Sequence, residues 1–203
     1  MEEAGSRVEL LISMLPINSF SYMLQKVNVE WTKLQAEAMG IRHVFWKTDG
    51  EKEKELNDIE AALKENMVTD LVTGAVASSY QKERIDGICK KLGIVHHSPL
   101  WGCDALEELK HVSGKFDAII TRVSAAGLDE SFLGKRIAPD IIEKLLRIKE
   151  KNKINISFEG GEAESFVLDA PLFKNRIRIN KSHIVWNGDS GDYIIDDAEL
   201  VDK

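Results

Sequence analysis

The feature that most constrains the fold is a regular alternation of strand-like and helix-like segments over the first two-thirds of the chain. Short runs rich in Val, Ile and Leu are separated by stretches whose apolar residues recur at helical spacing. Strands that alternate with helices are joined by right-handed crossovers and form a parallel sheet covered on both faces. We therefore predict an α/β fold with a doubly wound parallel sheet. The expected strands are residues 8–15, 43–48, 70–77, 95–101 and 118–123, and the expected helices are residues 30–39, 51–64, 79–92 and 104–111.

The alternation ends near residue 130. Residues 139–151 form one amphipathic helix, and the strand-like runs after it follow one another with turns and no helix between them. Such a run of strands is typical of an antiparallel sheet. We predict a Rossmann-like domain at residues 1–130 and a smaller α+β domain at residues 131–203. The later strand-like runs are residues 154–158, 165–168, 176–184 and 193–195.

Charge and cysteine content exclude several classes of function. A net charge of −7 disfavours a nucleic-acid partner, because neutralising phosphates requires clustered Lys and Arg. The N-terminal residues lack a signal-peptide pattern, and no apolar run reaches the length of a membrane span. The two cysteines, Cys89 and Cys103, lack metal-ligand spacing. We expect a cytoplasmic protein with no membrane or nucleic-acid partner and no protein-bound metal.

The most distinctive short stretch is acidic and contains a glycine pair. Four carboxylates lie within eleven positions around Gly160 and Gly161, just before an apolar strand-like run. Adjacent glycines allow a positive φ and a close approach to a ligand. If the stretch is extended, Glu162 and Glu164 share one face, and crowded carboxylates favour a cation nearby. One interpretation is a solvated acidic turn, and the other is a site for a metal, an ammonium group or an arginine.

Other candidate residues follow the predicted parallel strands, because ligands in such sheets bind beyond the carboxyl ends of the strands. Ser78 precedes Gln81 by three positions, which is a capping-box pattern. The same helix start, with small residues before it, also suits a phosphate. Tyr80 and Arg84 share a helix face, where Arg84 either grips a phosphate or pairs with a surface carboxylate. Trp101 is either a core anchor or a pocket wall.

Four segments, in this order, resemble those of the diphthine–ammonia ligases, a branch of the PP-loop ATPases. The last is Glu-Gly-Gly-Glu-x-Glu-x-x-Val-Leu-Asp-x-Pro at residues 159–171, and the others are residues 74–84, 99–102 and 124–129. The resemblance implies a Rossmann-like domain of the HUP type. These enzymes open with a strand and Ser-Gly-Gly-Lys-Asp-Ser, which this sequence does not contain. We expect the chain to begin just after that phosphate loop. Gln25 stands where the family pattern has His.

The resemblance implies that diphthine on translation elongation factor 2 is amidated to diphthamide. ATP with Mg²⁺ would adenylate the carboxylate, and ammonium would supply the nitrogen with release of AMP and pyrophosphate. The implied catalytic residues are Glu159, Glu162 and Glu164. The implied nucleotide-binding residues are Ser13, Met14, Gly74, Ala75 and Ser78. The implied substrate-binding residues are Tyr80, Gln81, Arg84, Trp101, Gly102, Ser124, Gly127, Gly160 and Gly161.

Two alternatives remain open at this point. The missing phosphate loop favours a binding module that keeps target recognition without ATP chemistry, and a related ATP pyrophosphatase would act on another carboxylate. We expect that the chain alone neither hydrolyses nor productively binds ATP. We also expect it to self-associate as a homo-oligomer, since a strand missing from a parallel sheet leaves unpaired backbone groups and exposed apolar surface.

Overall fold

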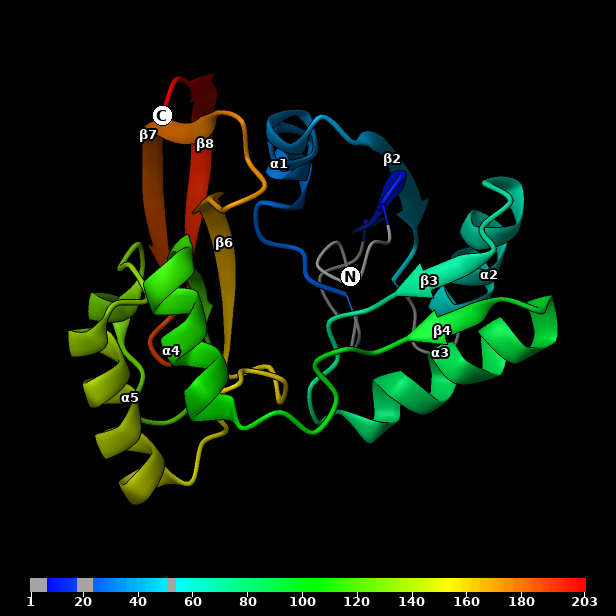
Figure 1. Ribbon diagram of the computed structural model, residues 1–203. Helices are drawn as coiled ribbons and strands as arrows, with labels where there is room; N and C mark the ends of the chain where they lie inside the picture. The colour runs from blue at the N-terminus through cyan, green and yellow to red at the C-terminus, as the bar shows by residue number, and fades with distance from the viewer. Residues whose placement is uncertain (1–6, 18–23, 51–53) are drawn as a thin grey trace. The chain divides into compact units, whose positions relative to one another are not determined.

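The computed structural model describes residues 7–17, 24–50 and 54–203, and the chain divides into two compact units (Figure 1). Unit 1 comprises Ile41–Cys103 together with the described part of Met1–Val29. Unit 2 comprises Glu30–Gly40 and Asp104–Lys203. The predicted boundary at residues 130/131 is therefore wrong by about one strand and one helix. Ser21, Tyr22 and Met23, just before Gln25, lie outside the described residues.

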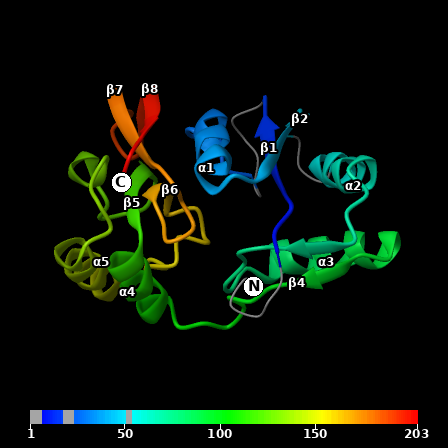
Figure 2. The ribbon, with the colours of Figure 1, turned by 45° about the horizontal axis from the view of Figure 1, so that its top comes forward.

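Unit 1 contains parallel strands with helices between them, as predicted. Its described strands form two parallel pairs rather than one continuous sheet, as Figure 2 shows, and Ser13 pairs in register with Phe45. The first pair is β1 (Leu10–Pro16) with β2 (Arg42–Thr48), and the second is β3 (Asp70–Val72) with β4 (Val95–His97). The helices are α2 (Glu55–Glu65) and α3 (Ser79–Leu92).

Two predicted strands of unit 1 are shorter than expected. β3 ends at Val72 and β4 at His97, and the chain then leaves the sheet at both places. The two segments that follow remain tied to each other, because the Gly102 N–H donates to the Val76 carbonyl at 2.8 Å. Pro99 lacks an N–H with which to extend the ladder of β4.

Unit 2 is built on one antiparallel sheet with the order β6-β5-β8-β7. Its core has two parts, one on each face of β5. On one face Ile120 packs with Leu145 of α5, and on the other Ile119 packs with Ala38 of α1. The strands are β5 (Asp117–Val123), β6 (Ala163–Asp169), β7 (Arg176–Trp186) and β8 (Gly191–Val201). The helices are α1 (Thr32–Met39), α4 (Ala105–Lys115) and α5 (Pro139–Asn152), with short 3₁₀ turns η2 (Val29–Trp31) and η3 (Glu130–Phe132).

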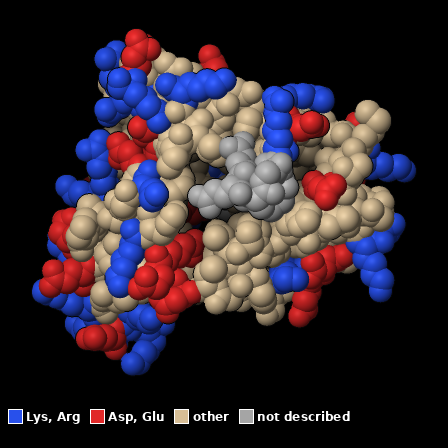
Figure 3. Space-filling model, viewed as in Figure 1, with Lys and Arg blue, Asp and Glu red and all other residues tan. Residues whose placement is uncertain are grey.

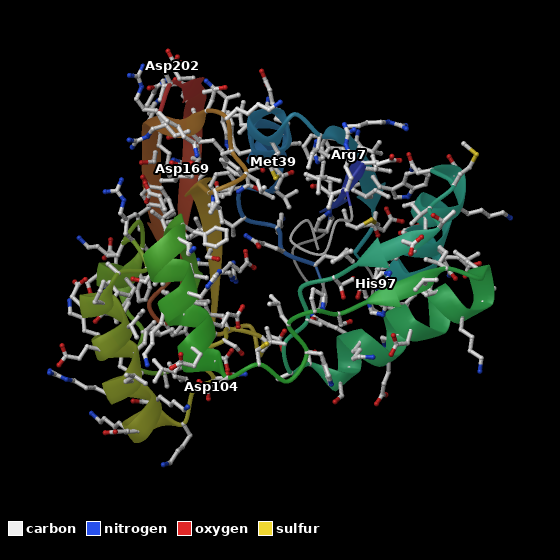
Figure 4. All side chains as sticks on the ribbon, viewed as in Figure 1. Arg7, Met39, His97, Asp104, Asp169 and Asp202 are labelled. Carbon is white, nitrogen blue, oxygen red and sulfur yellow. The ribbon has the colours of Figure 1, made fainter. Side chains whose placement is uncertain are left out.

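Helix starts in unit 2 are specified locally by the sequence. Asp104, labelled in Figure 4, caps α4 by accepting from the N–H groups of Leu106 and Glu107 at 2.9 and 3.0 Å. α5 begins with Pro139, whose fixed φ suits the first turn. α4 and α5 lie side by side, as Figures 1 and 2 both show.

Two segments depart from the predicted topology. The run at residues 118–123 was expected as the last parallel strand, but β5 pairs antiparallel with β6 and β8. Its apolar composition reflects burial on both faces, which parallel and central antiparallel strands share. Residues 30–39 form a helix ended by Gly40 (φ 69°), as predicted, yet this helix belongs to unit 2. The indole N–H of Trp31 donates to the Ile195 carbonyl at 2.9 Å, and Gln35 donates to the Val167 carbonyl at 2.9 Å.

The predicted strand at residues 154–158 is a pair of turns instead. The Asn155 side chain accepts from both the N–H and the hydroxyl of Ser157, at 3.1 and 2.9 Å. Phe158 has a φ of 65°. Local side-chain hydrogen bonds of this kind compete with strand pairing. Among the described residues, no helix has the length and apolar content required to cross a bilayer.

Candidate functional site

The acidic stretch forms a structured loop just before β6, at residues 158–162, which we call the acidic loop. It turns back on itself, because the Gly161 N–H donates to the Phe158 carbonyl at 3.1 Å. Gly161 has a φ of 80°, a conformation that favours glycine. A Cβ at Gly160 would lie 2.6 Å from the Glu162 carboxylate, so that position must also be small. The two glycines are therefore explained by the shape of the loop.

Glu162 uses its carboxylate to hold the loop together. One oxygen accepts from the Asn155 N–H at 3.0 Å and the other from the Gly160 N–H at 2.8 Å. Glu162 precedes β6 rather than lying in it, so the expected pairing of Glu162 and Glu164 on one strand face does not occur. The geometry gives Glu162 a positioning role in the acidic loop.

The segment after β5 lies against the acidic loop. The Ser124 N–H donates to the Glu162 carbonyl at 2.9 Å, and the Ser124 hydroxyl donates to the Gly161 carbonyl at 2.5 Å. Gly127 lies elsewhere: it has a φ of 92°, and a Cβ there would lie 2.9 Å from Ile148 and Asn152 of α5. Close packing against α5 thus explains Gly127 without a ligand.

Glu159 of the acidic loop lies close enough to a second carboxylate, Glu108 of α4, for the two negative charges to interact. The sequence did not single out Glu108. One oxygen of Glu108 is buried and accepts no hydrogen bond from any described residue. Burial, reinforced by the negative charge of Glu159, raises the pKa of the Glu108 carboxyl above its ordinary value. Two half-buried carboxylates in this arrangement attract a cation or a proton.

Glu164 lies on β6 beside a charged row that crosses the sheet. The strand register pairs Arg122 of β5 with Glu164 on one side and with Asp192 of β8 on the other. The Arg122 guanidinium donates to Asp192 at 2.7 Å. Arg122 thus places positive charge among the carboxylates at this end of the sheet.

The predicted nucleotide-binding residues of unit 1 lie on β1 and after β3. Ser13 and Met14 are half-buried on β1, and the Ser13 hydroxyl is 2.9 Å from Nε2 of His43. Gly74 and Ala75 follow β3, and their N–H groups donate to no described residue. Ser78 caps α3, with its hydroxyl 3.4 Å from the Gln81 N–H. The capping interpretation of Ser78 is confirmed, and its role toward a phosphate stays a prediction.

The predicted substrate-binding residues on and beside α3 form two cation–aromatic contacts. The Arg84 guanidinium stacks 3.5 Å from the centroid of the Tyr80 ring. Lys82 lies 5.5 Å from the centroid of the Trp101 ring, and Trp101 is 39% exposed. Trp101 is therefore no core anchor, and it lies in the turn beside Gly102, which has a φ of 77°. The side chains of this group form a partly exposed aromatic and cationic surface on unit 1.

Metal ligands do not gather within the described residues, where no group of three or more His, Cys, Asp or Glu side chains is placed to hold an ion. Figure 3 shows Lys and Arg interspersed with Asp and Glu on the face that it draws. The sequence interpretation found the acidic loop because its residues are consecutive. It missed Glu108, because this residue belongs to a different segment of the chain. The residues around Glu108 indicate only a helix that begins after Asp104.

Comparisons with known proteins agree with this division of the chain. Residues 1–96 match the family described as the diphthamide synthase N-terminal domain, and residues 104–201 match the diphthamide synthase C-terminal domain. The two matches bracket the boundary between the units after Cys103. The acidic loop therefore belongs to the part matched by the C-terminal domain.

Named relatives agree with these matches. The human diphthine–ammonia ligase is 33% identical over 183 residues, which cover 81% of this chain and 68% of the relative. The zebrafish (Danio rerio) enzyme of the same name is 34% identical, covering 83% of this chain and 72% of the relative. The Schizosaccharomyces pombe enzyme is 42% identical over 115 residues, covering 56% of this chain and 19% of the relative.

A solved structure, a predicted tRNA methyltransferase subunit from Methanocaldococcus jannaschii, covers 80% of this chain and 84% of its own at 11% identity. Its TM-score of 0.37 is too low to support an argument. The family matches and the identities to the named relatives, together with the glycine-paired acidic loop, lead to one conclusion: the chain belongs to the diphthine–ammonia ligase family.

Proposed function

We propose that this protein acts in the ATP-dependent amidation of diphthine on translation elongation factor 2, with ammonium as the nitrogen source. The observation that carries the proposal is the pair of interacting carboxylates, Glu108 and Glu159, beside a glycine-paired loop that Glu162 holds in shape. Diphthine bears a cationic head group, and ammonium is also a cation. Carboxylates can hold either one by accepting its N–H groups or by charge pairing.

In this proposal Glu108 and Glu159 bind the cation and accept its proton. A raised pKa brings the basicity of Glu108 closer to neutral pH, where a general base is most effective. Glu162 and Ser124 position the loop and make no contact with reacting atoms. Glu164 and the neighbouring Arg122 are the other charged residues of the proposed site.

Unit 1 would supply the nucleotide contacts. The unbonded N–H groups of Gly74 and Ala75, and the start of α3 behind them, fit an anionic or polar ligand. Bound ATP with Mg²⁺ supplies the adenylation that makes the diphthine carboxylate reactive. Ser13, Met14 and Ser78 would line the same nucleotide, and Tyr80, Arg84 and Trp101 would contact the target protein.

The experiment measures diphthamide formation and AMP release with diphthine-bearing elongation factor 2, ATP and ammonium. It uses a version of the protein extended upstream through a Ser-Gly-Gly-Lys-Asp-Ser segment, because the chain alone is expected not to bind ATP productively. Glu159→Gln should lower the rate about 10²-fold or more, because loss of a positioned acid–base group typically costs that much. Glu150→Gln, an exposed glutamate on α5, is the matched control and should keep the parent rate. Equal rates for the two variants would make the acidic loop an ordinary solvated turn.

A second measurement separates ligation from binding. Calorimetry with the diphthine-bearing factor reports recognition without requiring ATP. Binding without any AMP release in the parent protein would contradict ligase activity for this chain and favour the binding module.

A further inference from the structure

A chain of hydrogen bonds in unit 1 links a carboxylate, an imidazole and two hydroxyl groups. Oδ1 of Asp86 lies 2.5 Å from Nδ1 of His96, and Nε2 of the same ring lies 2.8 Å from the Thr73 hydroxyl and 3.3 Å from the Ser98 hydroxyl. The three elements involved are α3, β4 and the end of β3. His97, labelled in Figure 4, is the last residue of β4 and marks this end of the strand pair.

The environment fixes how the imidazole is oriented. The His96 side chain is only 5% exposed, and the Thr73 N–H donates to the His97 carbonyl at 3.0 Å, which holds the hydroxyl-bearing residue against β4. Hydrogen bonds from Lys82 and then His96 hold the pKa of the Asp86 carboxyl below its ordinary value. An ionised Asp86 retains the proton on Nδ1, and Nε2 is then the acceptor for the Thr73 hydroxyl.

The backbone after Thr73 presents hydrogen-bond donors that could stabilise the oxygen of a reacting carbonyl group. Gly74 and Ala75 present N–H groups that donate to no described residue, one and two positions after the hydroxyl. A Cβ built on Gly74 would meet no atom within 4 Å, so the space beside it is open. In acyl-transfer enzymes, the N–H of the residue after the nucleophile is a common oxyanion donor.

We propose that Thr73, His96 and Asp86 form a nucleophile–base–acid triad that hydrolyses activated carboxylic esters. This activity requires no ATP. It uses the N–H groups of Gly74 and Ala75 that the ligase proposal assigns to the nucleotide, so bound nucleotide should block it. The three groups satisfy the geometric criteria for such a triad: a nucleophile–base bond, a base–carboxylate bond and adjacent N–H donors.

Water is the only reagent that this reaction consumes besides the ester. The Thr73 oxygen bonds to the acyl carbon while its proton passes to Nε2 of His96, and the bond to the leaving alcohol breaks as that alcohol takes the proton. A water molecule then attacks the acyl-threonine, giving one proton to Nε2. The carboxylic acid departs, and the proton on Nε2 returns to the Thr73 oxygen. Asp86 pairs with the imidazolium at each transfer.

The test is the hydrolysis of p-nitrophenyl acetate by the whole chain without nucleotide, together with mass spectrometry of the acylated protein. Thr73→Val removes the hydroxyl at nearly constant shape, and His96→Gln removes the base. Each should lower the rate by about 10²-fold or more. Thr73→Ser keeps a hydroxyl and should keep turnover. The acyl group should be found on the peptide that contains Thr73.

The controls separate this activity from unspecific acylation and from misfolding. Ser98→Ala should keep close to the parent rate, and thermal unfolding of each variant reports its fold. Loss of turnover in Ser98→Ala with full turnover in Thr73→Val would overturn the assignment of Thr73. A parent rate no higher than that of His96→Gln, or acylation confined to lysines, would overturn the proposal altogether.

Discussion

Units 1 and 2 carry strands of similar apolar composition but bury them to different extents. In unit 2, Ile120 and Val123 of β5 are fully buried because helices cover both faces of the sheet. In unit 1, Ile12 of β1 is only partly buried, and Val72 and Val95 of the second strand pair are 40% and 54% exposed. An apolar run therefore specifies a strand, while its burial depends on what the rest of the unit provides to cover it.

The difference in strand burial between the units affects how rigidly each candidate site is positioned. The acidic loop is anchored by Glu162 and Ser124 to a unit whose central strand is buried on both faces. Gly74 and Ala75 follow a three-residue strand with exposed neighbours. We infer that the acidic loop is preorganised in the free protein, whereas the strand ends of unit 1 require a ligand to become equally fixed.

The largest expected effect is the loss of core packing in unit 2. Leu145→Ala, at a position with no exposed surface, should lower the free energy of unfolding by about 3–4 kcal/mol. Leu63→Ala in α2 is the matched change in unit 1 and should cost about 2 kcal/mol, because partly exposed neighbours can close over the cavity. Urea denaturation with hydrogen-exchange peptides from each unit provides both numbers. Equal losses would remove the proposed difference between the units.

The next effect concerns the anchor of the acidic loop. Glu162→Gln keeps the shape of the side chain but replaces one accepting oxygen by an NH₂ group, which cannot accept from a backbone N–H. We expect a loss of about 1–2 kcal/mol in unfolding free energy, because hydrogen bonds to a charged acceptor are the stronger kind. Glu150→Gln, at an exposed position on α5, serves as its control and should cost no stability. If the two variants are equally stable, Glu162 does not anchor the loop.

Glu108→Gln should give the smallest effect, with the opposite sign. Burial and the charge of Glu159 raise the pKa of the Glu108 carboxyl in the folded state, so its ionised form destabilises the fold at neutral pH. The variant should be about 0.5 kcal/mol more stable than the parent at pH 7. This gain should vanish as the pH falls through the raised folded-state pKa of Glu108, where the parent takes up its proton. Thermal unfolding across pH measures it.

Glu107→Gln is the matched control for this change. Glu107 lies in the first turn of α4 and pairs with Lys110 at 2.8 Å, so its charge is favourable. Its removal should slightly lower stability at pH 7. A stabilising Glu107→Gln, or a Glu108→Gln whose benefit grows on acidification, would contradict the assigned environments.

Local patterns in the sequence predicted most of the individual elements. The helix ends at Gly40 and Gly93 and the Ser78 cap all follow from residues close together in the chain. Topology was harder, since the pattern of β5 does not reveal the direction of its neighbours. The sequence pattern places α1 in the first domain. In the structure, however, Trp31 just before α1 and Gln35 within it donate hydrogen bonds to strands far along the sequence.

Some residues of the candidate sites can likewise be found from local sequence, and others cannot. Glu159 and Glu164 stand out because they are concentrated around two glycines. Glu108 beside Glu159, and His96 between Asp86 and Thr73, depend on contacts between segments that no local spacing encodes. The sequence predicted a strand at residues 95–101, but only the packing of α3 against β4 gives His96 its carboxylate, Asp86.

Hydrogen exchange of the free protein tests the preorganisation of the acidic loop most directly. Peptides covering residues 154–166 and 117–123 should exchange slowly, because their N–H groups are bonded within the buried sheet and the Glu162 anchor. Peptides covering residues 10–16 and 70–76 should exchange faster by orders of magnitude in the same sample. Equal protection of the two sets, or slower exchange at residues 70–76 than at residues 154–166, would contradict the account.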